Sequence, residues 1–207
     1  MSRGPGKWTV LAALFALLLL ADQGTKFLAV DRLTSVFLRH GEVTFLEKVR
    51  GFYTHRHLDL QTTGGYTVWA PAWRFIYVEN PGAAFSFLAG GAEGIRNVFF
   101  SVISVAAVLF VLAYYRRLRR EQRYHQVALA MLLAGAVGNF VDRLARRYVI
   151  DFIDWYAGRY HWPTFNVADS LIVLGVALLL LHPGQRRAAS APAGGAAGRE
   201  PARQRGA

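Results

Sequence analysis

The sequence predicts an α-helical polytopic membrane protein, a four-transmembrane-helix bundle that carries a small antiparallel β-sheet outside the membrane. Hydrophobic residues make up 54% of the 207-residue chain, its mean hydropathy is +0.24, and the apolar residues gather into four blocks. Basic clusters flank these blocks, as topology signals do. The longest polar region, residues 31–94, contains short stretches typical of strands.

The strong positive charge does not indicate nucleic-acid binding. The formal net charge is +11 and the isoelectric point is near 10.5, but most of the excess lies in short clusters beside apolar blocks. A nucleic-acid-binding module would present a basic face with interleaved aromatic residues, and the sequence has none. The chain contains no cysteine, which excludes disulfides, a thiolate nucleophile and cysteine-based metal sites.

The first apolar block, residues 8–30, has two interpretations. A short basic start, an apolar core and Ala21 resemble a cleaved signal peptide. However, apolar residues resume beyond Asp22 and Lys26, so the block is long enough for the ~20 residues that a bilayer requires. We therefore predict a retained first transmembrane helix.

Three further spans are predicted at residues 97–115, 126–142 and 165–181. Five arginines lie between the second and third spans, and such a cluster marks the cytoplasmic side. Four spans with this loop inside place both termini in the cytoplasm. We predict one membrane-embedded domain over residues 1–182 and a disordered cytoplasmic tail over 183–207, because the tail is rich in Ala, Gly, Pro and Arg and lacks periodicity.

The outer polar region is predicted to be mainly β structure, over about residues 40–94. Residues 43–46, 66–69 and 75–78 read as strands, with Gly64-Gly65 as a turn. The His55-x-His57 pair lacks a cysteine or carboxylate at ligand spacing, so two exposed loop histidines are favoured over a metal site.

Unusual polar residues all fall at the outer face of the predicted bundle. Asp151 and Asp169 are the most informative, because each is embedded in apolar neighbours and a carboxylate at the edge of a low-dielectric region is costly. The others at this face are Asp22, Lys26, Asn80, Asn139, Asp142, Arg143 and Asn166. The arginines that set the topology were not used to choose these residues, so their convergence favours a functional site.

Structural roles remain open for several of these residues. Asp22 and Lys26 are four residues apart and can simply neutralise each other on one helix face. Asp169 can cap a helix together with Asn166. Asp142 and Arg143 read as an interfacial ion pair.

The loop acids have structural alternatives too. Asp151 can pair with Arg143, Arg146 or Arg147 in a solvated loop, and Asp154 reads as an exposed loop carboxylate.

Five motifs occur in order along these spans: Asp22-Gln-Gly-Thr-Lys26, Asn80-Pro-Gly-Ala-Ala-Phe85, Gly138-Asn-Phe-Val-Asp-Arg143, Val149-Ile-Asp-Phe152 and Phe165-Asn-Val-Ala-Asp169. Together they resemble the motif set of the lipoprotein signal peptidases (signal peptidase II), over about residues 8–182. Members of this family are bacterial inner-membrane aspartyl peptidases. They cut diacylglyceryl-modified prolipoproteins just before the lipidated cysteine.

The resemblance implies a role for each matching position. Asp151 and Asp169 match the catalytic dyad. The positions that hold substrate or order the site are Asp22, Lys26, Asn80, Gly82, Asn139, Asp142, Arg143 and Asn166. The expected partners are lipid-modified prolipoproteins and membrane lipids, with no metal, cofactor or nucleic acid. The expected location is the inner membrane, with the site towards the periplasmic face.

Two departures from the family pattern stand out. The segment between Lys26 and Asn80 is longer than the family leads us to expect, which predicts an extra hairpin or loop in the sheet. Ala134 stands where the first glycine of a Gly-Gly pair is expected. The first departure affects the expected substrate range more than the chemistry.

Two carboxylates held close together in a poorly solvated site share one proton, because both cannot be ionised. The ionised partner can take a proton from water while the protonated partner polarises the scissile carbonyl. A small transporter or channel subunit with an ion pathway is the main alternative, but it requires polar residues through the membrane depth. A different intramembrane aspartyl protease requires aspartates at mid-depth, and a simple anchor leaves the polar cluster unexplained.

Overall fold

The computed structural model describes residues 5–55, 64–82 and 93–181, with side chains from residue 97 onward in the last range. The predicted tail, His57 and residues 83–85 of the second motif lie outside the described residues. The long helices are α1 (Lys7–Leu33), α4 (Glu93–Arg117), α5 (Arg123–Arg146) and α6 (Val167–Leu181). Two short helices, α2 (Val36–Arg39) and α3 (Phe45–Thr54), follow α1.

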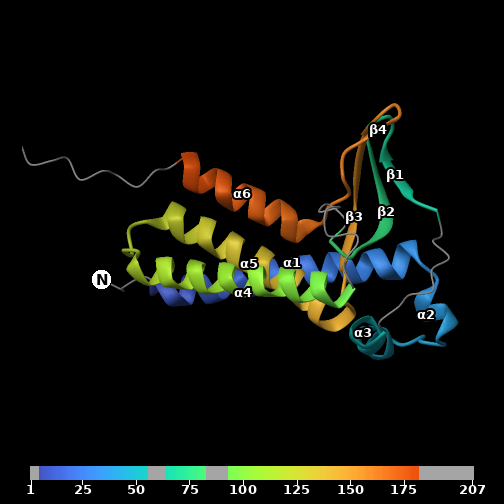
Figure 1. The fold of residues 1–207 in the computed structure, drawn as a ribbon, viewed down its shortest axis with the longest axis horizontal. Coiled ribbons are helices and arrows are strands. Elements are labelled where there is room, and N and C mark those ends of the chain that lie inside the picture. Colours follow the sequence, from blue (N-terminus) through green and yellow to red (C-terminus); the bar gives the residue numbers. More distant parts are fainter. Residues whose placement is uncertain (1–4, 56–63, 83–92, 182–207) are drawn as a thin grey trace, which may run out of the picture.

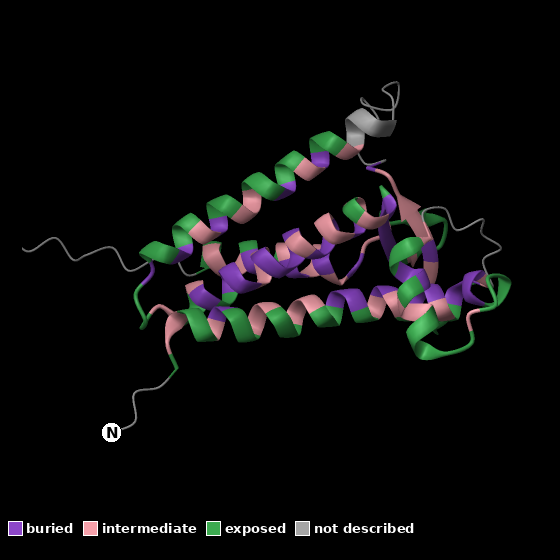
Figure 2. Cartoon of the chain, turned by 90° about the horizontal axis from the view of Figure 1, so that it is seen from below, coloured by how far each residue is buried: buried purple, intermediate pink, exposed green. Residues whose placement is uncertain are grey.

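The four long helices form the predicted bundle, with α5 packed against α1, α4 and α6 (Figure 1). Three of them, α1, α4 from Asn97 and α5, are long and apolar enough to cross a membrane, and the fourth, α6, is apolar but has 15 residues. The central helix, α5, is largely buried, whereas the other long helices expose much of their surface (Figure 2).

The exposed surface of these helices is apolar, which suits lipid better than water. Large exposed side chains include Leu17, Leu20, Phe110, Val173 and Leu180. Exposed apolar patches of this extent mark a contact surface, and on helices of this length the contact is the bilayer. The predicted fold class is therefore confirmed.

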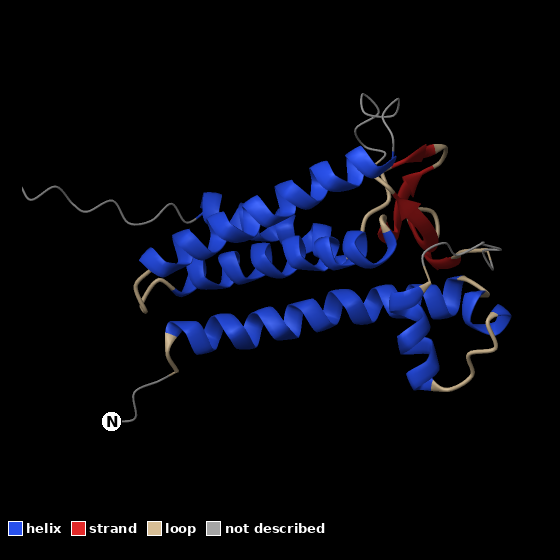
Figure 3. Ribbon diagram, turned by 60° about the horizontal axis from the view of Figure 1, so that its bottom comes forward, coloured by secondary structure: helices blue, strands red, loops and turns tan. Residues whose placement is uncertain are grey.

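A four-stranded antiparallel sheet stands across one end of the bundle (Figures 1 and 3). Its order is β1 (Tyr66–Trp69), β2 (Trp73–Asn80), β3 (Val149–Ala157) and β4 (Tyr160–His161). The pairing of β2 with β3 contains a register shift between Phe75 and Val78, so β2 has one extra residue there. The strands predicted at residues 66–69 and 75–78 are confirmed.

The contribution of residues 149–161 to the sheet was not predicted. These residues were interpreted as a loop, but they form β3 and β4, and β3 is an inner strand paired on both sides. The run Val149-Ile-Asp-Phe-Ile has the β-branched and aromatic composition of a buried strand. Its acidic residues made a loop the more obvious interpretation.

The strand predicted at residues 43–46 is wrong. Thr44 instead caps α3: its hydroxyl accepts from the Glu47 N–H at 3.3 Å, while the Glu47 carboxylate accepts from the Thr44 N–H at 2.9 Å. Thr-x-x-Glu is the sequence signature of such a capping box, and it overrides the strand propensity of Val43 and Phe45. The described part of the long segment after Lys26 therefore contains the two short helices α2 and α3 ahead of the hairpin formed by β1 and β2.

The short helices pack onto the end of α1 that lies nearest the sheet. Phe52 of α3 and Phe37 of α2 are buried, and both rings lie 5.6 Å from the ring of Phe27. This aromatic cluster continues into the sheet through Ile150 and Phe152 of β3. As a result α1, α2, α3 and the sheet share one hydrophobic core at this end of the bundle.

Candidate active site

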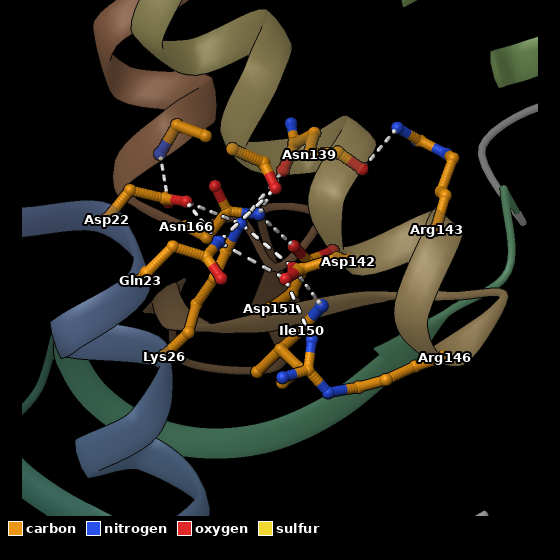
Figure 4. A network of polar contacts seen from close by, with 12 residues as sticks. Asp22, Gln23, Lys26, Asn139, Asp142, Arg143, Arg146, Ile150, Asp151 and Asn166 are labelled. Atoms are coloured by element: carbon orange, nitrogen blue, oxygen red, sulfur yellow. Dashed lines mark hydrogen bonds and ion pairs between the residues drawn. The ribbon is translucent and has the colours of Figure 1, made fainter. Parts of the chain in front are cut away.

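A fully buried group of charges joins α1 to α5. Lys26 Nζ lies 3.0 Å from Asp22 Oδ2 and 2.9 Å from Asp142 Oδ2, and none of the three side chains is exposed (Figure 4). The pair predicted between Asp22 and Lys26 is confirmed, and Asp142 adds a second carboxylate. Gln23 Nε2 also donates to Asp22 at 3.0 Å and to Asp142 at 3.3 Å.

Arg146 extends this group towards α3. Its Nη1 donates to Asp142 Oδ1 at 3.0 Å, and its Nε and Nη2 donate to the Phe52 carbonyl at 2.9 and 2.6 Å. The guanidinium also lies 3.9 Å from the centroid of the Phe52 ring. We name Asp22, Lys26, Asp142 and Arg146 the charged cluster. It contains two acidic and two basic side chains, so their formal charges cancel within the buried region.

The predicted ion pair between Asp142 and Arg143 is wrong. Asp142 pairs with Lys26 and Arg146, because residues four apart share a helix face whereas adjacent residues do not. Arg143 donates to the Asn139 carbonyl at 3.2 Å, and its guanidinium lies 5.1 Å from the centroid of the Phe100 ring on α4. Arg143 therefore borders the site from the α4 side.

The charged cluster also fixes the start of α6. Asp22 Oδ1 accepts from the Ala168 backbone N–H at 2.9 Å, so a carboxylate of α1 satisfies a free donor in the first turn of α6. Gly138 makes this approach possible, because a Cβ at that position would clash with the Asp22 carboxylate.

Asn139 on α5 connects the charged cluster to Asp169. Its Oδ1 accepts from Lys26 Nζ at 3.1 Å and from Asn166 Nδ2 at 3.2 Å, while its Nδ2 donates to Asp169 Oδ1 at 2.8 Å. Both the oxygen and the nitrogen of the buried Asn139 side-chain amide therefore form hydrogen bonds. The orientation of Asp169 depends on α5 as well as on its own helix.

Asn166 joins the two aspartates that the sequence singled out. Its Nδ2 donates to Asp151 Oδ1 at 2.7 Å, and its backbone N–H donates to Asp169 Oδ2 at 3.2 Å. Its Oδ1 accepts in turn from the Asp169 backbone N–H at 3.1 Å. The predicted cap between Asn166 and Asp169 is confirmed, and the same residue contacts Asp151.

Asp151 on β3 is buried and accepts from two neutral amides. The second donor is Asn80 at the end of β2, whose Nδ2 lies 2.8 Å from Asp151 Oδ2. Asn80 is itself held by the Gly82 N–H, which donates to Asn80 Oδ1 at 2.8 Å. Gly82 has a φ of +96°, in the region that favours glycine. The alternative in which Asp151 pairs with a loop arginine is wrong.

Burial raises the pKa of Asp151 to about 7, and the nearby charge of Asp169 acts in the same direction. The hydrogen bonds from Asn80 and Asn166 and the more distant charge of Lys26 lower the pKa of this carboxyl, but they do not offset its burial. At neutral pH Asp151 is therefore populated in both protonation states.

Asp154, predicted as an exposed loop carboxylate, is 1% exposed. Its Oδ2 accepts from Arg74 Nε at 2.6 Å, and its Oδ1 lies 2.9 Å from His161 Nδ1. Asp154 shares neither of the amide donors of Asp151, which are Asn80 and Asn166. It is not part of the candidate site.

Residues outside the motifs also take part in the site, and they were not predicted. Arg146 and the α3 carbonyl of Phe52 complete the charged cluster, and Tyr53 donates to Gln23 Oε1 at 3.3 Å. The i, i+4 spacing of Asp142 and Arg146 was a usable signal. The α3 contacts carried no sequence signal, because they join segments 94 residues apart.

No group of three or more His, Cys, Asp or Glu side chains within the described residues is arranged to hold a metal ion. His55 is partly buried, lies 2.9 Å from a Glu42 carboxylate oxygen and stacks on His40. The favoured interpretation of this histidine as an exposed loop residue is therefore wrong.

Comparison with known proteins identifies the family. The family model described as Signal peptidase (SPase) II matches residues 14–183. The lipoprotein signal peptidase of Anaeromyxobacter sp. (strain Fw109-5) is 59% identical over 186 residues, 88% of each chain. That of Syntrophus aciditrophicus (strain SB) is 40% identical over 147 residues, 71% of this chain and 90% of the relative.

A solved structure of a bacterial membrane enzyme has the same fold. It superposes with a TM-score of 0.60 at 23% sequence identity, covering 86% of this chain and 94% of the other. The small transporter considered from the sequence finds no support among these relatives. From its match to the family and its close relatives, the chain belongs to the signal peptidase II family.

Proposed function

We propose that this protein is an aspartyl endopeptidase that removes the signal peptide from diacylglyceryl-modified prolipoproteins, cutting before the lipidated cysteine. Asp151 and Asp169 are the catalytic residues. The observation that carries the proposal is that one residue, Asn166, contacts both carboxyl groups. The side chain of Asn166 binds one carboxyl group and its backbone N–H binds the other, which supports a common site of action for the two acids.

The raised pKa of Asp151 supports Asp151 as the carrier of the shared proton. A carboxyl group with a pKa of about 7 can donate a hydrogen bond to the scissile carbonyl oxygen at neutral pH. Asp169 then acts as the base and takes a proton from a water molecule. Its contacts with Asn139 Nδ2 and the Asn166 backbone N–H hold it in position for this step.

The reaction balances with these two groups and one water. The water oxygen bonds to the carbonyl carbon as Asp169 accepts a water proton and Asp151 gives its proton to the carbonyl oxygen. When the tetrahedral intermediate collapses, the hydroxyl proton returns to Asp151 and Asp169 passes its proton to the leaving nitrogen. The C–N bond breaks, and both carboxyl groups recover their starting states without a covalent intermediate.

The remaining motif residues order this pair. Asn80, Asn139 and Asn166 orient the carboxyl groups through amide hydrogen bonds, and the charged cluster holds α1, α5 and α6 together behind them. Gly82 and Arg143 border the site on the β2 and α4 sides. These residues position the reacting groups and contact the peptide.

The site faces the periplasmic side of a bacterial inner membrane, with both termini in the cytoplasm. This orientation follows from charge, because Arg116, Arg117, Arg119 and Arg120 lie at the α4–α5 turn, opposite the sheet (Figure 1). Clustered arginines at one end of a bundle are retained in the cytoplasm.

The test uses purified protein in lipid nanodiscs with a prolipoprotein in two forms, lipidated and unlipidated. We expect release of the signal peptide from the lipidated form only. Asp151→Asn and Asp169→Asn should each lower the rate by roughly 10²–10⁴-fold, the contribution of general acid–base catalysis. Asp154→Asn is the matched control, because it makes the same change on the same strand at a carboxylate that pairs with Arg74 and His161 and contacts neither Asn80 nor Asn166.

Wild-type rates in both dyad variants, each inserted and folded, would exclude these residues from the chemistry. Equal cleavage of both precursor forms would leave a peptidase but remove the proposed lipid requirement. Loss of activity in Asp154→Asn to the level of the dyad variants would show that the assay reports folding.

A further inference from the structure

The turn from α5 into β3 is closed by Asp142. The helix ends at Arg146, and Arg147 follows in the left-handed conformation with a φ of 71°. Asp142 Oδ2 accepts from the Ile150 backbone N–H at 3.2 Å (Figure 4). Ile150 directly precedes Asp151 on β3. A carboxylate of α5 therefore fixes the backbone next to a candidate catalytic residue.

The other oxygen of Asp142 is connected to α3. Oδ1 accepts from Arg146 Nη1 at 3.0 Å and from Gln23 Nε2 at 3.3 Å. Arg146 also donates to the Phe52 carbonyl, and Gln23 Oε1 accepts from the Tyr53 hydroxyl at 3.3 Å. Two adjacent residues of α3 thus reach Asp142 by separate routes, each through one intermediate side chain.

The route through Arg146 caps the C-terminal end of α3. The last four carbonyls of a helix lack partners within it, and Phe52 is in the last turn of α3. Arg146 Nε and Nη2 lie 2.9 and 2.6 Å from the Phe52 oxygen, and the Arg146 side chain is only 1% exposed. The helix dipole also favours a cation at this end. Displacement of α3 would therefore remove the acceptor of two buried donors, which is costly.

The position of α3 is fixed by contacts outside the candidate site. A capping box orders the start of the helix. Near its end the buried Phe52 ring meets the Phe27 ring of α1 edge-on, with the centroids 5.6 Å apart. Gly51 lies so close to the Glu42 carboxylate that a Cβ there would clash with it. These contacts place α3 independently, so it can serve as a fixed support for Asp142.

We propose that α3 is a positioning element for the reaction, and that Tyr53 and Arg146 are positioning residues that act on Asp151 through Asp142. The hydrogen bonds run from α3 to Asp142 and from there to the backbone N–H that precedes Asp151. They set where β3 presents the Asp151 carboxyl group. None of the five motifs includes α3, so the proposal assigns a role to the long segment after Lys26. It rests on the proposed catalytic function of Asp151.

The first experiment measures the attachment of β3 without using activity, by hydrogen exchange of single amides in lipid nanodiscs. In Arg146→Lys the charge is kept, but the planar fork that reaches a carboxylate and a carbonyl together is lost. We expect the Ile150 amide to exchange roughly fivefold faster, the equivalent of about one hydrogen bond. The Tyr156 amide, which donates to the Ala72 carbonyl at 2.9 Å, should keep its rate. Arg147→Lys is the matched control, since it makes the same change at the exposed neighbouring residue and should leave both amides unchanged.

The second experiment removes only the Tyr53 hydroxyl. With rates normalised to folded protein, Tyr53→Phe should lower kcat on a lipidated precursor roughly fivefold and leave KM unchanged. Tyr114→Phe on α4 is the matched control, because Tyr114 is 42% exposed and Tyr53 is 41% exposed, and it should keep the wild-type rate. Gln23→Met removes the next residue of the same route. In that background Tyr53→Phe should therefore change kcat by less than about twofold.

The pH profile separates positioning from stability. Burial is the largest cause of the raised pKa of Asp151. A loosened β3 admits water, so Arg146→Lys should lower this pKa and move the alkaline limb of kcat/KM to lower pH. A smaller folded fraction lowers the rate at every pH and leaves the limb in place. The limb should also stay in place in Arg147→Lys.

Three results would overturn the proposal. Wild-type exchange of the Ile150 amide in Arg146→Lys would show that α3 does not hold β3. Equal losses from Tyr53→Phe in the wild-type and Gln23→Met backgrounds would exclude the route through Gln23. A lower rate in Arg146→Lys with an unmoved alkaline limb would reduce α3 to a stabilising element. Because the exchange is measured without substrate, failure of the proposed peptidase function is distinguishable from failure of this attachment.

Discussion

The two groups of polar residues at the sheet end of the bundle are built on different principles. In the charged cluster every carboxylate faces a cation, as between Lys26 and Asp142 at 2.9 Å. Asp151 and Asp169 accept their hydrogen bonds from the neutral amides of Asn80, Asn139 and Asn166 and from a backbone N–H. The charged cluster therefore combines opposite charges, whereas the neighbours that donate to Asp151 and Asp169 are neutral.

This difference fits a structural role for the charged cluster and the catalytic role that we propose for Asp151 and Asp169. A cation within hydrogen-bond distance of Asp151 would hold it ionised, and it would then no longer donate to a carbonyl oxygen. The protein instead separates Lys26 from Asp169 by one neutral residue, because Asn139 hydrogen-bonds to both of them. Asn139 transmits position between the two groups without bringing a formal charge to the dyad.

The largest effect on stability is expected from Lys26→Met. This change leaves Asp22 and Asp142 buried without their shared cation, and the loss of one partner from a buried ion pair costs about 3–5 kcal/mol. The free energy of unfolding in mixed micelles measures the loss. Lys48→Met is the control, because it removes a partly exposed pair with Asp31, and such pairs contribute roughly 0–1 kcal/mol.

A second variant sharpens the interpretation of Lys26→Met. Adding Asp22→Asn removes one of the stranded charges, so the double variant should recover part of the lost stability. If the double variant is as unstable as the sum of the two single changes, the cluster is not held by charge compensation.

On the dyad side, two replacements of Asn166 separate its capping role from its contact with Asp151. Serine is as good a helix cap as asparagine, but it does not carry the amide donor that reaches Asp151. We therefore expect Asn166→Ser to keep the stability of α6 and to lose activity by roughly tenfold or more, as for a misplaced catalytic group. Asn166→Ala should lose a comparable amount of activity and a further ~1 kcal/mol of stability.

The readouts for the Asn166 variants are kcat/KM on a lipidated precursor and the unfolding free energy of the same samples. Wild-type activity in Asn166→Ser would show that the amide does not orient Asp151. A loss of stability equal to that of Asn166→Ala would show that the activity change reflects the helix and not the dyad.

The pH profile tests the neutral environment of Asp151 directly. With a pKa of about 7, Asp151 loses its proton as the pH rises through neutrality, so kcat/KM should fall on the alkaline side. The hydrogen bond from Asn80 stabilises the ionised form and lowers this pKa. Asn80→Ala should therefore raise the pKa of Asp151 and move the alkaline limb to higher pH, even though the maximal rate falls.

The direction in which the alkaline limb moves in Asn80→Ala tests this interpretation. Movement of the limb to lower pH in Asn80→Ala would mean that another group controls the profile. Asp154→Asn should leave the limb in place, because the causes of the Asp151 pKa shift are burial, Asp169, Asn80, Asn166 and Lys26, whereas Asp154 pairs with Arg74 and His161.

The sequence predicts the parts of this molecule that depend on local pattern. The four spans, the strands at 66–69 and 75–78, the Asp22–Lys26 pair and the cap at Asn166 follow from hydropathy, alternation and fixed spacing. The order of the motifs along the spans also predicted that the polar residues of the site lie close together. Each of these signals involves residues within one segment or the composition of one segment.

The parts that were missed depend on contacts between distant segments. The strand character of residues 149–157 was hidden by Asp151 and Asp154, whose burial is offset by Asn80 and Arg74 from β2. The Arg146 side chain finds its acceptor at Phe52, 94 residues away. A buried charge is acceptable only where a partner meets it, and the meeting of such partners is a property of the tertiary fold.

The smallest effect on stability is expected at Asp154 of β3, which pairs with Arg74 and His161. Burial of Asp154 opposes its ionisation, but hydrogen bonds from His161 and Arg74 outweigh it and lower the pKa of this carboxyl below its ordinary 3.8. A group with a lowered pKa in the folded state contributes stability above its unfolded pKa and loses it as the pH falls through the folded value.

Asp154→Asn should therefore cost about 1 kcal/mol or less at pH 7, because Arg74 is partly exposed and solvent weakens the pair. The difference from wild type should shrink below pH 4 as Asp154 becomes protonated in both states. Unfolding free energies of the two proteins between pH 3 and pH 7 measure this. A difference in unfolding free energy that stays constant from pH 3 to pH 7 would show that packing of Asp154, and not its charge, stabilises this part of the sheet. In that case the stabilisation at Asp154 would differ from that of the charged cluster in its physical source as well as in its magnitude.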